Sequence, residues 1–467
     1  MDMITPAEAS AHEEGQSFEI DVERIQLMQI KISTAPQSLV DSNGKRYPFI
    51  HRLPPRFPDS ETSSYIPHTV SIGPLHRGKD QYRYIEQFKW SYLHALMDRK
   101  KLSLEDLIKK IMPLEHRARK SYTEEVDQLD SFEFVEMLIL DGCFIIELFR
   151  KSRQILSFEH DQITSVSNIY QSILEDLIKL ENQIPWIILE ELFSITRSSI
   201  TLEETIVSAF RDTFREYNMK SNLNIMNNYS MSTNRFGGEP FQPFRHLLHM
   251  LHTLFTSLWP EIPDIEFKTR YAHLSKMIQP RVIPSISDLQ KAGITAKTGD
   301  TKFFLKADFK HGTLLMTPLI LNNLMICLLF NSMAFEQCQD PTKTQFSTYI
   351  TLLNCLMTND NDVKYLIDQK IIQVQNFSGT ENDVIKIFRN MGKGLTLEPK
   401  TSYLSELFYN INLYHGKKWN VQMAKLSNTY FDSPWSAISL LAASVLLVLT
   451  FIQTFYTIIA YNNPPRS

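Results

Sequence analysis

The sequence predicts a mainly α-helical protein, with one large helical domain, a small β-hairpin within it, and a single C-terminal transmembrane helix. Three observations predict this fold class. Glycine accounts for only 14 of 467 residues, whereas ~7% is usual. Apolar residues recur at helical spacing through most of the chain. No charged residue stands between Ser433 and Pro465.

The composition narrows the range of functions. Apolar residues make up 43% and charged residues 21%, which is ordinary for a protein with a packed core. The 48 basic and 52 acidic residues leave a net charge of −4. So balanced a charge argues against nucleic-acid binding by bulk electrostatics, and we expect no nucleic-acid partner. Scarce glycine also argues against a Rossmann domain or a propeller.

The chain divides into four parts by composition. Residues 1–46 are polar and irregular and predict a flexible N-terminal arm. Residues 47–430 predict the helical domain. Within it, residues 218–240 hold six Asn and a Gly-Gly pair, which is typical of a surface insertion. The transmembrane helix is predicted at 434–460, and a short tail follows at 461–467.

Helical patterns occupy most of the body. Ser103 opens a capping-box pattern ahead of Leu104–Met112. Glu133–Arg150 is apolar except on one arc and predicts a largely buried helix. Further helices are expected at Ile163–Ile195 (broken or kinked by Pro185), Pro243–Trp259, Ser285–Ala292 (closed by Gly293), Leu319–Phe335 and Tyr349–Leu366.

One short region changes to the period of a β-strand. Phe303, Leu305, Ala307 and Phe309 alternate with polar residues. A turn-like Lys-His-Gly follows, and then the apolar run Leu314–Thr317. This pattern predicts the hairpin.

The C-terminal segment has the length and composition of a membrane span. Ala437–Ala460 is 24 residues long, enough to cross a ~30 Å hydrocarbon layer at ~1.5 Å per residue. Trp435 and Tyr456 stand near the expected interfaces. A buried core helix is the alternative, which so long an uncharged run disfavours. The residues expected within the span include Ala437, Leu441, Leu446, Phe451 and Ala460.

The flanking charges predict the topology. Lys417, Lys418 and Lys425 precede the span and only Arg466 follows it, so the positive-inside bias places the large N-terminal part in the cytosol. The N-terminus has no apolar signal region, and the four cysteines are scattered without a disulfide framework. We therefore expect a tail-anchored, single-pass protein of the plasma membrane or an endomembrane, with the lipid bilayer as one partner.

The sharpest enzymatic candidate is the segment Gly73–Lys79. It has the GxxxxGK spacing of a phosphate-binding loop, follows a strand-like Thr69–Ile72, and could be served by Asp141 as a magnesium ligand. However, Asp80 stands where that loop needs Ser or Thr, and Pro74 removes a backbone donor. A turn that caps the next helix is favoured, and a nucleotide-binding hydrolase is the alternative.

Other polar groups favour structural roles. His246, His249 and His252 recur every three residues, which favours the edge of an amphipathic helix over a metal site. The amides of Asn182 and Gln183, beside Glu181 and before Pro185, could satisfy carbonyls that a broken helix leaves unpaired. No pattern of catalytic residues is present, so we expect no catalytic, metal or cofactor site.

Several motifs in order resemble one plant family, known as domain of unknown function 247. They run from Ser64-Tyr-Ile-Pro67 and Val70-Ser-Ile-Gly-Pro-Leu-His76, through Leu140-Asp-Gly-Cys-Phe144 and Leu180-Glu-Asn-Gln-Ile-Pro185, to Ala334-Phe-Glu-Gln337 and Ser433-Pro-Trp435. The sequence departs from the family pattern at Leu75 and Arg77. The family-motif candidates are Gly73, Pro74, His76, Arg119, Asp141, Glu181, Asn182, Gln183, Pro185, Glu336 and Gln337.

The resemblance implies a helical protein with one C-terminal span and no established activity or cofactor. Some grass members are implicated as pollen-side determinants of self-incompatibility, acting by recognition. We therefore expect a membrane-anchored recognition or scaffold protein that binds an unknown protein partner, as a homo- or hetero-oligomer. Residues 218–240 and the N-terminal arm would carry partner specificity. A further alternative is a structural membrane organiser, which would use small residues such as Ala442 and Ala443 for close helix contact.

Overall fold

The computed structural model describes residues 48–55, 57, 62–123, 126, 128–153, 163, 166–196, 198–211, 214, 217, 223, 244–256, 282–299, 304–339, 344–375, 379–393, 395, 403–417 and 434–462. The chain has two compact units, Met1–Pro48 and Phe49–Ser467. The predicted arm at 1–46 lies outside the described residues, and so does the predicted insertion at 218–240 except for Leu223.

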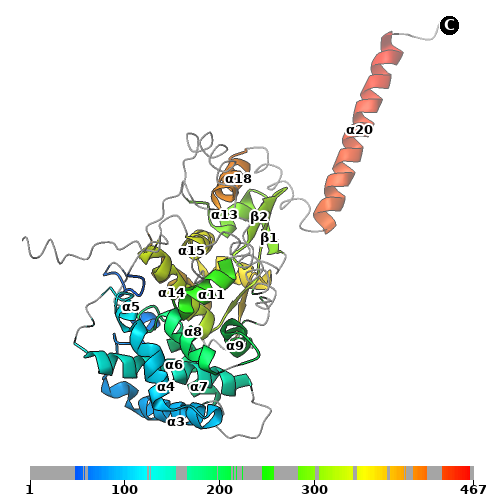
Figure 1. Cartoon of the computed structure of the whole chain (residues 1–467). Helices are drawn as coiled ribbons and strands as arrows, with labels where there is room; N and C mark the ends of the chain where they lie inside the picture. The colour runs from blue at the N-terminus through cyan, green and yellow to red at the C-terminus, as the bar shows by residue number, and fades with distance from the viewer. Residues whose placement is uncertain are drawn as a thin grey trace, which may run out of the picture. The chain divides into compact units, whose positions relative to one another are not determined.

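The long helix α6 (Ser131–Arg153) is the centre of the first group of helices (Figure 1). Its apolar side chains between Phe134 and Phe149 are buried, which confirms the predicted buried helix. The helices that contact it are α3 (Arg83–Lys100), α4 (Leu104–Ile111), α5 (Glu115–Arg119), α8 (Trp186–Ile195) and α9 (Leu202–Ala209). The 3₁₀ turns η2 (Asp80–Tyr82) and η3 (Met112–Leu114) precede α3 and α5.

A second group surrounds α14 (Asn323–Cys338), which is buried on nearly every side. The elements in contact with it are α2 (Thr62–Tyr65), α7 (Ser167–Leu177), α11 (Leu247–Thr256), α15 (Gln345–Leu356) and β4 (Leu319–Leu321). Helix α17 (Glu381–Lys393) packs against α15 and α16 (Asp360–Asp368). Because α2 and α7 contact α14, segments that are far apart in the chain share this core.

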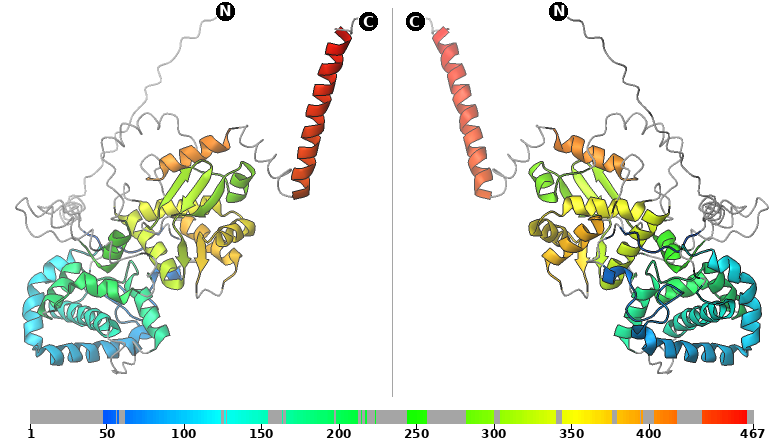
Figure 2. Two further views of the ribbon diagram at one scale, coloured as in Figure 1. Left: turned by 90° about the vertical axis from the view of Figure 1, so that its right-hand side faces the viewer. Right: turned by 90° about the vertical axis from the view of Figure 1, so that its left-hand side faces the viewer.

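The predicted hairpin is confirmed. Strands β2 (Ala307–Lys310) and β3 (Thr313–Met316) pair antiparallel, with Ala307 opposite Met316, and Gly312 in the turn has a φ of +78°. The sequence did not predict that β1 (Thr295–Thr298) adds to β3 in parallel, nor that β4 pairs in parallel with β5 (Ile372–Val374). Helix α18 (Ser405–His415) packs on β2 (Figure 2), and α13 (Ile286–Lys291) precedes β1.

Three predicted helices are shorter than expected. Leu319–Phe335 is not one helix, because Leu319–Leu321 forms β4 and the Asn322 side chain caps α14. Tyr349–Leu366 is not one helix either, because the Asn359 side chain forms a capping box that starts α16 afresh. In Ile163–Ile195 the predicted break at Pro185 is confirmed, because α8 begins directly after it, but α7 already ends at Leu177. In the first two cases a side-chain cap, from Asn322 or Asn359, starts a new helix inside the predicted one.

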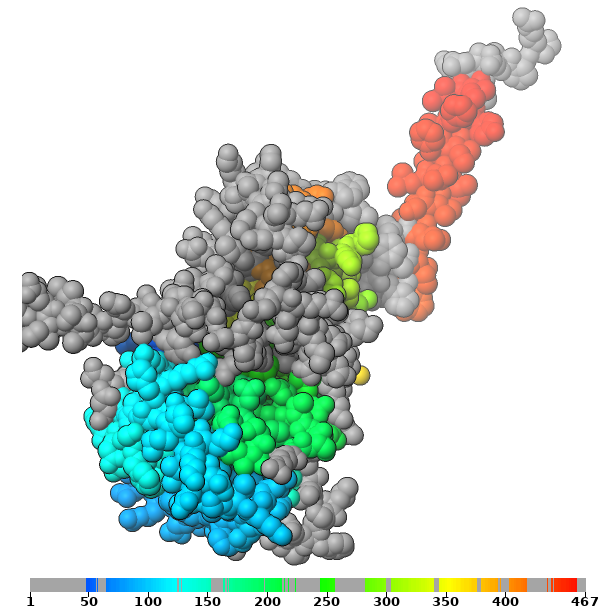
Figure 3. Space-filling model, in the orientation of Figure 1, coloured from blue at the N-terminus to red at the C-terminus, as the bar shows by residue number. Residues whose placement is uncertain are grey.

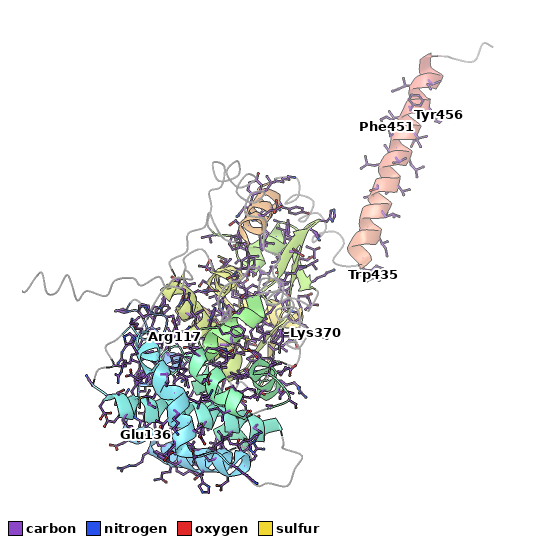
Figure 4. The ribbon with its side chains drawn as sticks, in the orientation of Figure 1. Arg117, Glu136, Lys370, Trp435, Phe451 and Tyr456 are labelled. Carbon is purple, nitrogen blue, oxygen red and sulfur yellow. The ribbon has the colours of Figure 1, made fainter. Side chains whose placement is uncertain are left out.

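Helix α20 (Pro434–Asn462) is 29 residues long. Its central segment, Leu441–Ile459, is long and apolar enough to cross a membrane, and none of it is buried by the rest of the described chain. Its side chains are accordingly exposed along the helix (Figure 3). Trp435 lies at the start of the helix, and Phe451 and Tyr456 lie further along it (Figure 4).

Candidate functional site

The segment Ile66–His76, which contains the family motif Val70–His76, forms no strand or helix. The expected strand-like stretch Thr69–Ile72 has no strand partner among the described residues. Instead, the backbone N–H groups of His68 and Val70 each donate to the Asp176 carboxylate at 2.9 Å, and the N–H of Thr69 donates to it as well. A single α7 carboxylate therefore holds three successive amides.

Two further side chains continue this arrangement. The Ile72 amide donates to Asn182 Oδ1 at 2.6 Å, and the Gly73 amide donates to Asp141 Oδ2 at 2.8 Å. Asn182 belongs to the turn after α7, and Asp141 lies in the middle of α6. The amides of this segment are thus satisfied from two separate helical regions, as buried backbone donors require.

Side chains also occupy the carbonyl groups of the segment. The Tyr82 hydroxyl donates to Pro67 O at 2.8 Å, and Asn182 Nδ2 donates to Val70 O at 3.0 Å. The ammonium groups of Lys179 and Lys89 donate to Ile66 O and Ser71 O. Side chains therefore replace the neighbouring strands that would normally pair with such an extended backbone. We call this set of contacts the brace: Tyr82, Lys89, Asp141, Asp176, Lys179 and Asn182 around Ile66–Gly73.

An ion pair stands at the centre of the brace. Lys89 Nζ lies 2.6 Å from Asp141 Oδ1, and each side chain is only 1% exposed. Lys89 comes from α3 and Asp141 from α6, which are packed together. A second carboxylate, Glu86, lies 2.5 Å from the same ammonium group. Removing one member of a buried pair leaves an unpaired charge, so this contact ties the two helices together strongly.

His76 and Glu181 form a second buried pair at the end of the segment. Lys79 Nζ lies 3.0 Å from His76 Nδ1. An ammonium group has donors only, so Nδ1 accepts, and the ring proton is on Nε2. His76 Nε2 lies 2.9 Å from Glu181 Oε2, and the Leu53 amide donates to Glu181 Oε1 at 2.8 Å. Burial raises the pKa of Glu181, but the contacts with His76 and the Leu53 amide, together with the Arg52 charge, outweigh burial, and the pKa is lowered overall.

Gly73 occupies a position that leaves no room for a side chain. Its φ is +75°, and an added Cβ would lie 2.5 Å from the carbonyl oxygen of Gln183. That carbonyl accepts from the Tyr122 hydroxyl at 3.1 Å. Burial, together with the nearby Asp141 charge, raises the pKa of Tyr122 well above its ordinary value. The motif Gly and the Gln183 turn are thus in direct backbone contact.

The amides of the Glu-Asn-Gln motif confirm their expected role. Gln183 Nε2 donates to the carbonyls of Leu177 and Lys179, both at 2.8 Å, and Asn182 Nδ2 donates to Asp176 O at 2.9 Å. These are carbonyls at the broken end of α7. Pro185 then stands at the N-cap of α8. Gln183 Oε1 also accepts from the Leu248 amide at 3.1 Å, which joins the turn to α11.

The contacts of Gly73–Lys79 differ from those of a phosphate-binding loop. In such a loop the backbone amides face an anion, but the Gly73 amide faces the Asp141 carboxylate at 2.8 Å. Asp141 in turn pairs with Lys89, and Lys79 contacts His76. Among the described residues, no group of three or more His, Cys, Asp or Glu side chains is placed to hold a metal ion. In this arrangement, these side chains hold the backbone of the motif segment in position.

The remaining motif residues lie at two other places. Arg119 pairs with Glu115 and donates to the carbonyls of Val126, Leu129 and Asp130, so it holds the turn before α6. Glu336 accepts from the Phe346 and Ser347 amides, both at 2.8 Å, and so caps α15. Gln337 Nε2 lies 3.4 Å from Ser347 Oγ. Pro74 belongs to the turn beside Gly73.

For two of the three histidines, the predicted placement on an amphipathic edge is wrong, whereas His249 is partly exposed. His246 is fully buried beside Phe335, and His252 is 7% exposed, with Nε2 2.9 Å from Glu336 Oε1. Burial, aided by the nearby Arg245 charge, lowers the pKa of His246 well below its ordinary value. The error arose because Phe335 of α14 packs against both rings and Phe346 of α15 packs against His252, which spacing along one helix does not reveal.

Sequence reasoning missed Tyr82 and three charged residues of the brace, namely Lys89, Asp176 and Lys179. Each stands in a helix or turn among buried apolar neighbours, and each is at most 2% exposed. A charged residue on the otherwise apolar face of a predicted helix was the signal that could have found them, because such charges are seldom buried without a partner.

Comparison with known proteins shows to which family the chain belongs. The model of DUF247, described as a plant protein of unknown function, matches residues 50–449. The chain belongs to the DUF247 family. This DUF247 protein is 28% identical over 451 residues to UPF0481 protein At3g47200 of Arabidopsis thaliana, covering 93% of this chain and 91% of that relative.

A second Arabidopsis thaliana relative, putative UPF0481 protein At3g02645, is 21% identical over 482 aligned positions, covering 87% of this chain and 89% of the relative. No solved structure matches the chain.

Proposed function

We propose that this DUF247 protein is a single-pass, membrane-anchored recognition or scaffold protein, with its helical body in the cytosol, that acts by binding another protein. The observation that carries the proposal is α20, which is 29 residues long and free of charged residues. None of its central segment Leu441–Ile459 is packed against the described body. An apolar helix of this length that finds no protein core is best accommodated by a bilayer.

The polar side chains of α20 are compatible with insertion. The hydroxyls of Thr450, Thr454 and Thr457 each donate to the carbonyl four residues earlier, at 2.7–2.8 Å. A hydroxyl bonded within its own helix exposes no free donor to the hydrocarbon layer. Trp435 would stand at one interface, because aromatic residues with a polar atom favour the headgroup level.

The brace supports binding over catalysis. Asp141 and Asp176 both accept backbone amides and both face a lysine ammonium group. These groups hold the motif segment in one shape, which suits a rigid body whose loops meet a partner.

Alkaline extraction tests the membrane half of the proposal. We expect the full chain to remain with membranes at high pH, and a variant lacking 434–462 to be released. The topology can be tested with glycosylation tags at the two ends of the chain. Glycan on a tag at the N-terminal end would contradict a cytosolic body.

Proximity labelling from the body, in tissue that expresses the protein, tests the binding half. We expect a reproducible set of cytosol-facing neighbours that a body-less control, α20 fused to a tag, does not label. Nucleotide binding by the full chain decides the rival function. The proposal would be overturned by magnesium-dependent ATP binding that is abolished by Lys79→Ala. The same binding should stay intact with the exposed-lysine control Lys364→Ala.

A further inference from the structure

Helix α20 carries two different faces along its length. Six residues recur at alternating spacings of four and three, which places them on one side of a helix that pairs with another. We call them the polar seam: Ser439, Ala443, Leu446, Thr450, Gln453 and Thr457. The same spacing on the roughly opposite side defines the apolar seam: Leu441, Val445, Val448, Ile452, Phe455 and Ile459.

The two seams differ in how well lipid tails accommodate their side chains. The large apolar side chains of the apolar seam are as well accommodated by lipid tails as by another helix. The polar seam holds five small or polar residues and one leucine. Small residues let two backbones approach closely, and polar groups gain from a partner that can form hydrogen bonds.

Gln453 is the residue that most needs such a partner. It lies three positions from Thr450, the middle of the span Leu441–Ile459, which is ~4.5 Å along the axis at ~1.5 Å per residue. Its backbone carbonyl accepts from Thr457, but its side-chain carboxamide projects from the helix, where the described chain packs nothing against it. Two donors and an acceptor would otherwise face hydrocarbon.

We infer that α20 pairs in parallel with α20 of a second copy of this chain through the polar seam, with the two Gln453 carboxamides bonded to each other. The inference rests on the proposed membrane anchoring. Every copy of a single-pass protein has the same orientation, so Gln453 of each copy lies at the same depth. A carboxamide both donates and accepts, so two of them are mutually complementary. The spacing of four and three fits a left-handed crossing of about 20°.

Energy transfer between two differently tagged full-length chains, co-expressed in one membrane, tests the inference. We expect transfer from the parent chain, a several-fold loss with Gln453→Leu, and retention of most transfer with Gln453→Asn. Ile452→Ala is the matched control, since it removes a larger apolar side chain one residue away on the apolar seam and should leave transfer unchanged.

Cysteine cross-linking supplies a geometric check. Thr450→Cys should cross-link copies within the membrane and Val448→Cys should not, each compared with the unsubstituted chain and its four native cysteines.

Three outcomes would overturn the pairing: no transfer from the parent chain, equal transfer with Gln453→Leu, or an equal loss with Ile452→Ala. Gln453-dependent binding to a different membrane protein, without self-association, would also overturn the second copy as the partner. Alkaline extraction separates the two proposals. A chain that stays with membranes yet is monomeric refutes only the pairing, whereas a chain that is released refutes the anchoring itself.

Discussion

Two glycines of the motif segment allow the effect of crowding to be separated from the effect of backbone conformation. Gly73 and Gly78 have φ values of +75° and +82°, so alanine is strained at both. Their surroundings differ. An added Cβ at Gly73 would lie 2.5 Å from Gln183 O and 3.2 Å from the Tyr122 hydroxyl, whereas at Gly78 nothing lies within 4 Å. We therefore expect Gly73→Ala to destabilise the protein far more than Gly78→Ala.

The expected magnitudes follow from these contacts. The left-handed conformation costs alanine about 1 kcal/mol at either position. At Gly73 the overlap must push apart two backbone segments, at about 1–3 kcal/mol. It also disturbs the bond from the Gly73 amide to buried Asp141, at about 1–3 kcal/mol more. The loss in the free energy of unfolding should be about 3–7 kcal/mol for Gly73→Ala and about 1 kcal/mol for Gly78→Ala.

Thermal unfolding of the full chain in detergent, followed by far-ultraviolet circular dichroism at a fixed scan rate, measures the difference. For a body of roughly 370 residues the entropy of unfolding is ~0.8 kcal/mol/K. Gly73→Ala should then lower Tm by ~4–9 °C and Gly78→Ala by ~1 °C. Equal shifts, or a larger shift for Gly78→Ala, would refute the close contact between Gly73 and the Gln183 turn.

Two further predictions concern the charged groups. Lys89→Met leaves Asp141 buried without its ammonium partner and should lower the free energy of unfolding by about 3–5 kcal/mol. In the same melting assay, the double variant with Asp141→Asn should lose less stability than the sum of the losses from the two single variants. Losses that simply add would contradict the ion pair. The pKa of Glu181 is lowered in the folded state, so its contribution to stability is present above the unfolded value of ~4.5 and is lost as pH falls through the lower folded value. Glu181→Gln should therefore lower Tm at pH 7 and flatten the fall in Tm between pH 5 and 3, and an unchanged acid limb would count against the His76 contact.

Local pattern accounts for the elements that the sequence predicted well. The apolar face of α6, the capping box at Ser103 and the β2–β3 hairpin all depend on neighbours within a few residues. The candidate span in α20 could likewise be predicted from its own length and uncharged composition, without knowledge of the rest of the chain. Parallel pairs such as β1–β3 and β4–β5 escaped prediction because their partners are separated by other elements.

The contacts of the brace could not be predicted from short-range sequence patterns. The sequence placed Gly73, His76, Asp141 and the Glu-Asn-Gln motif in one family series, but it could not show that they meet. Asp141 is 68 residues from the amide it accepts, and Asp176 is 106 residues from the Val70 amide. The sequence by itself determined the helical class, the candidate span and the motif residues, because these follow from composition and short-range spacing. Only the tertiary structure decided which charges are buried, with which partners, and which backbone they hold, because a buried charge is stabilised by groups that the fold brings from distant parts of the chain.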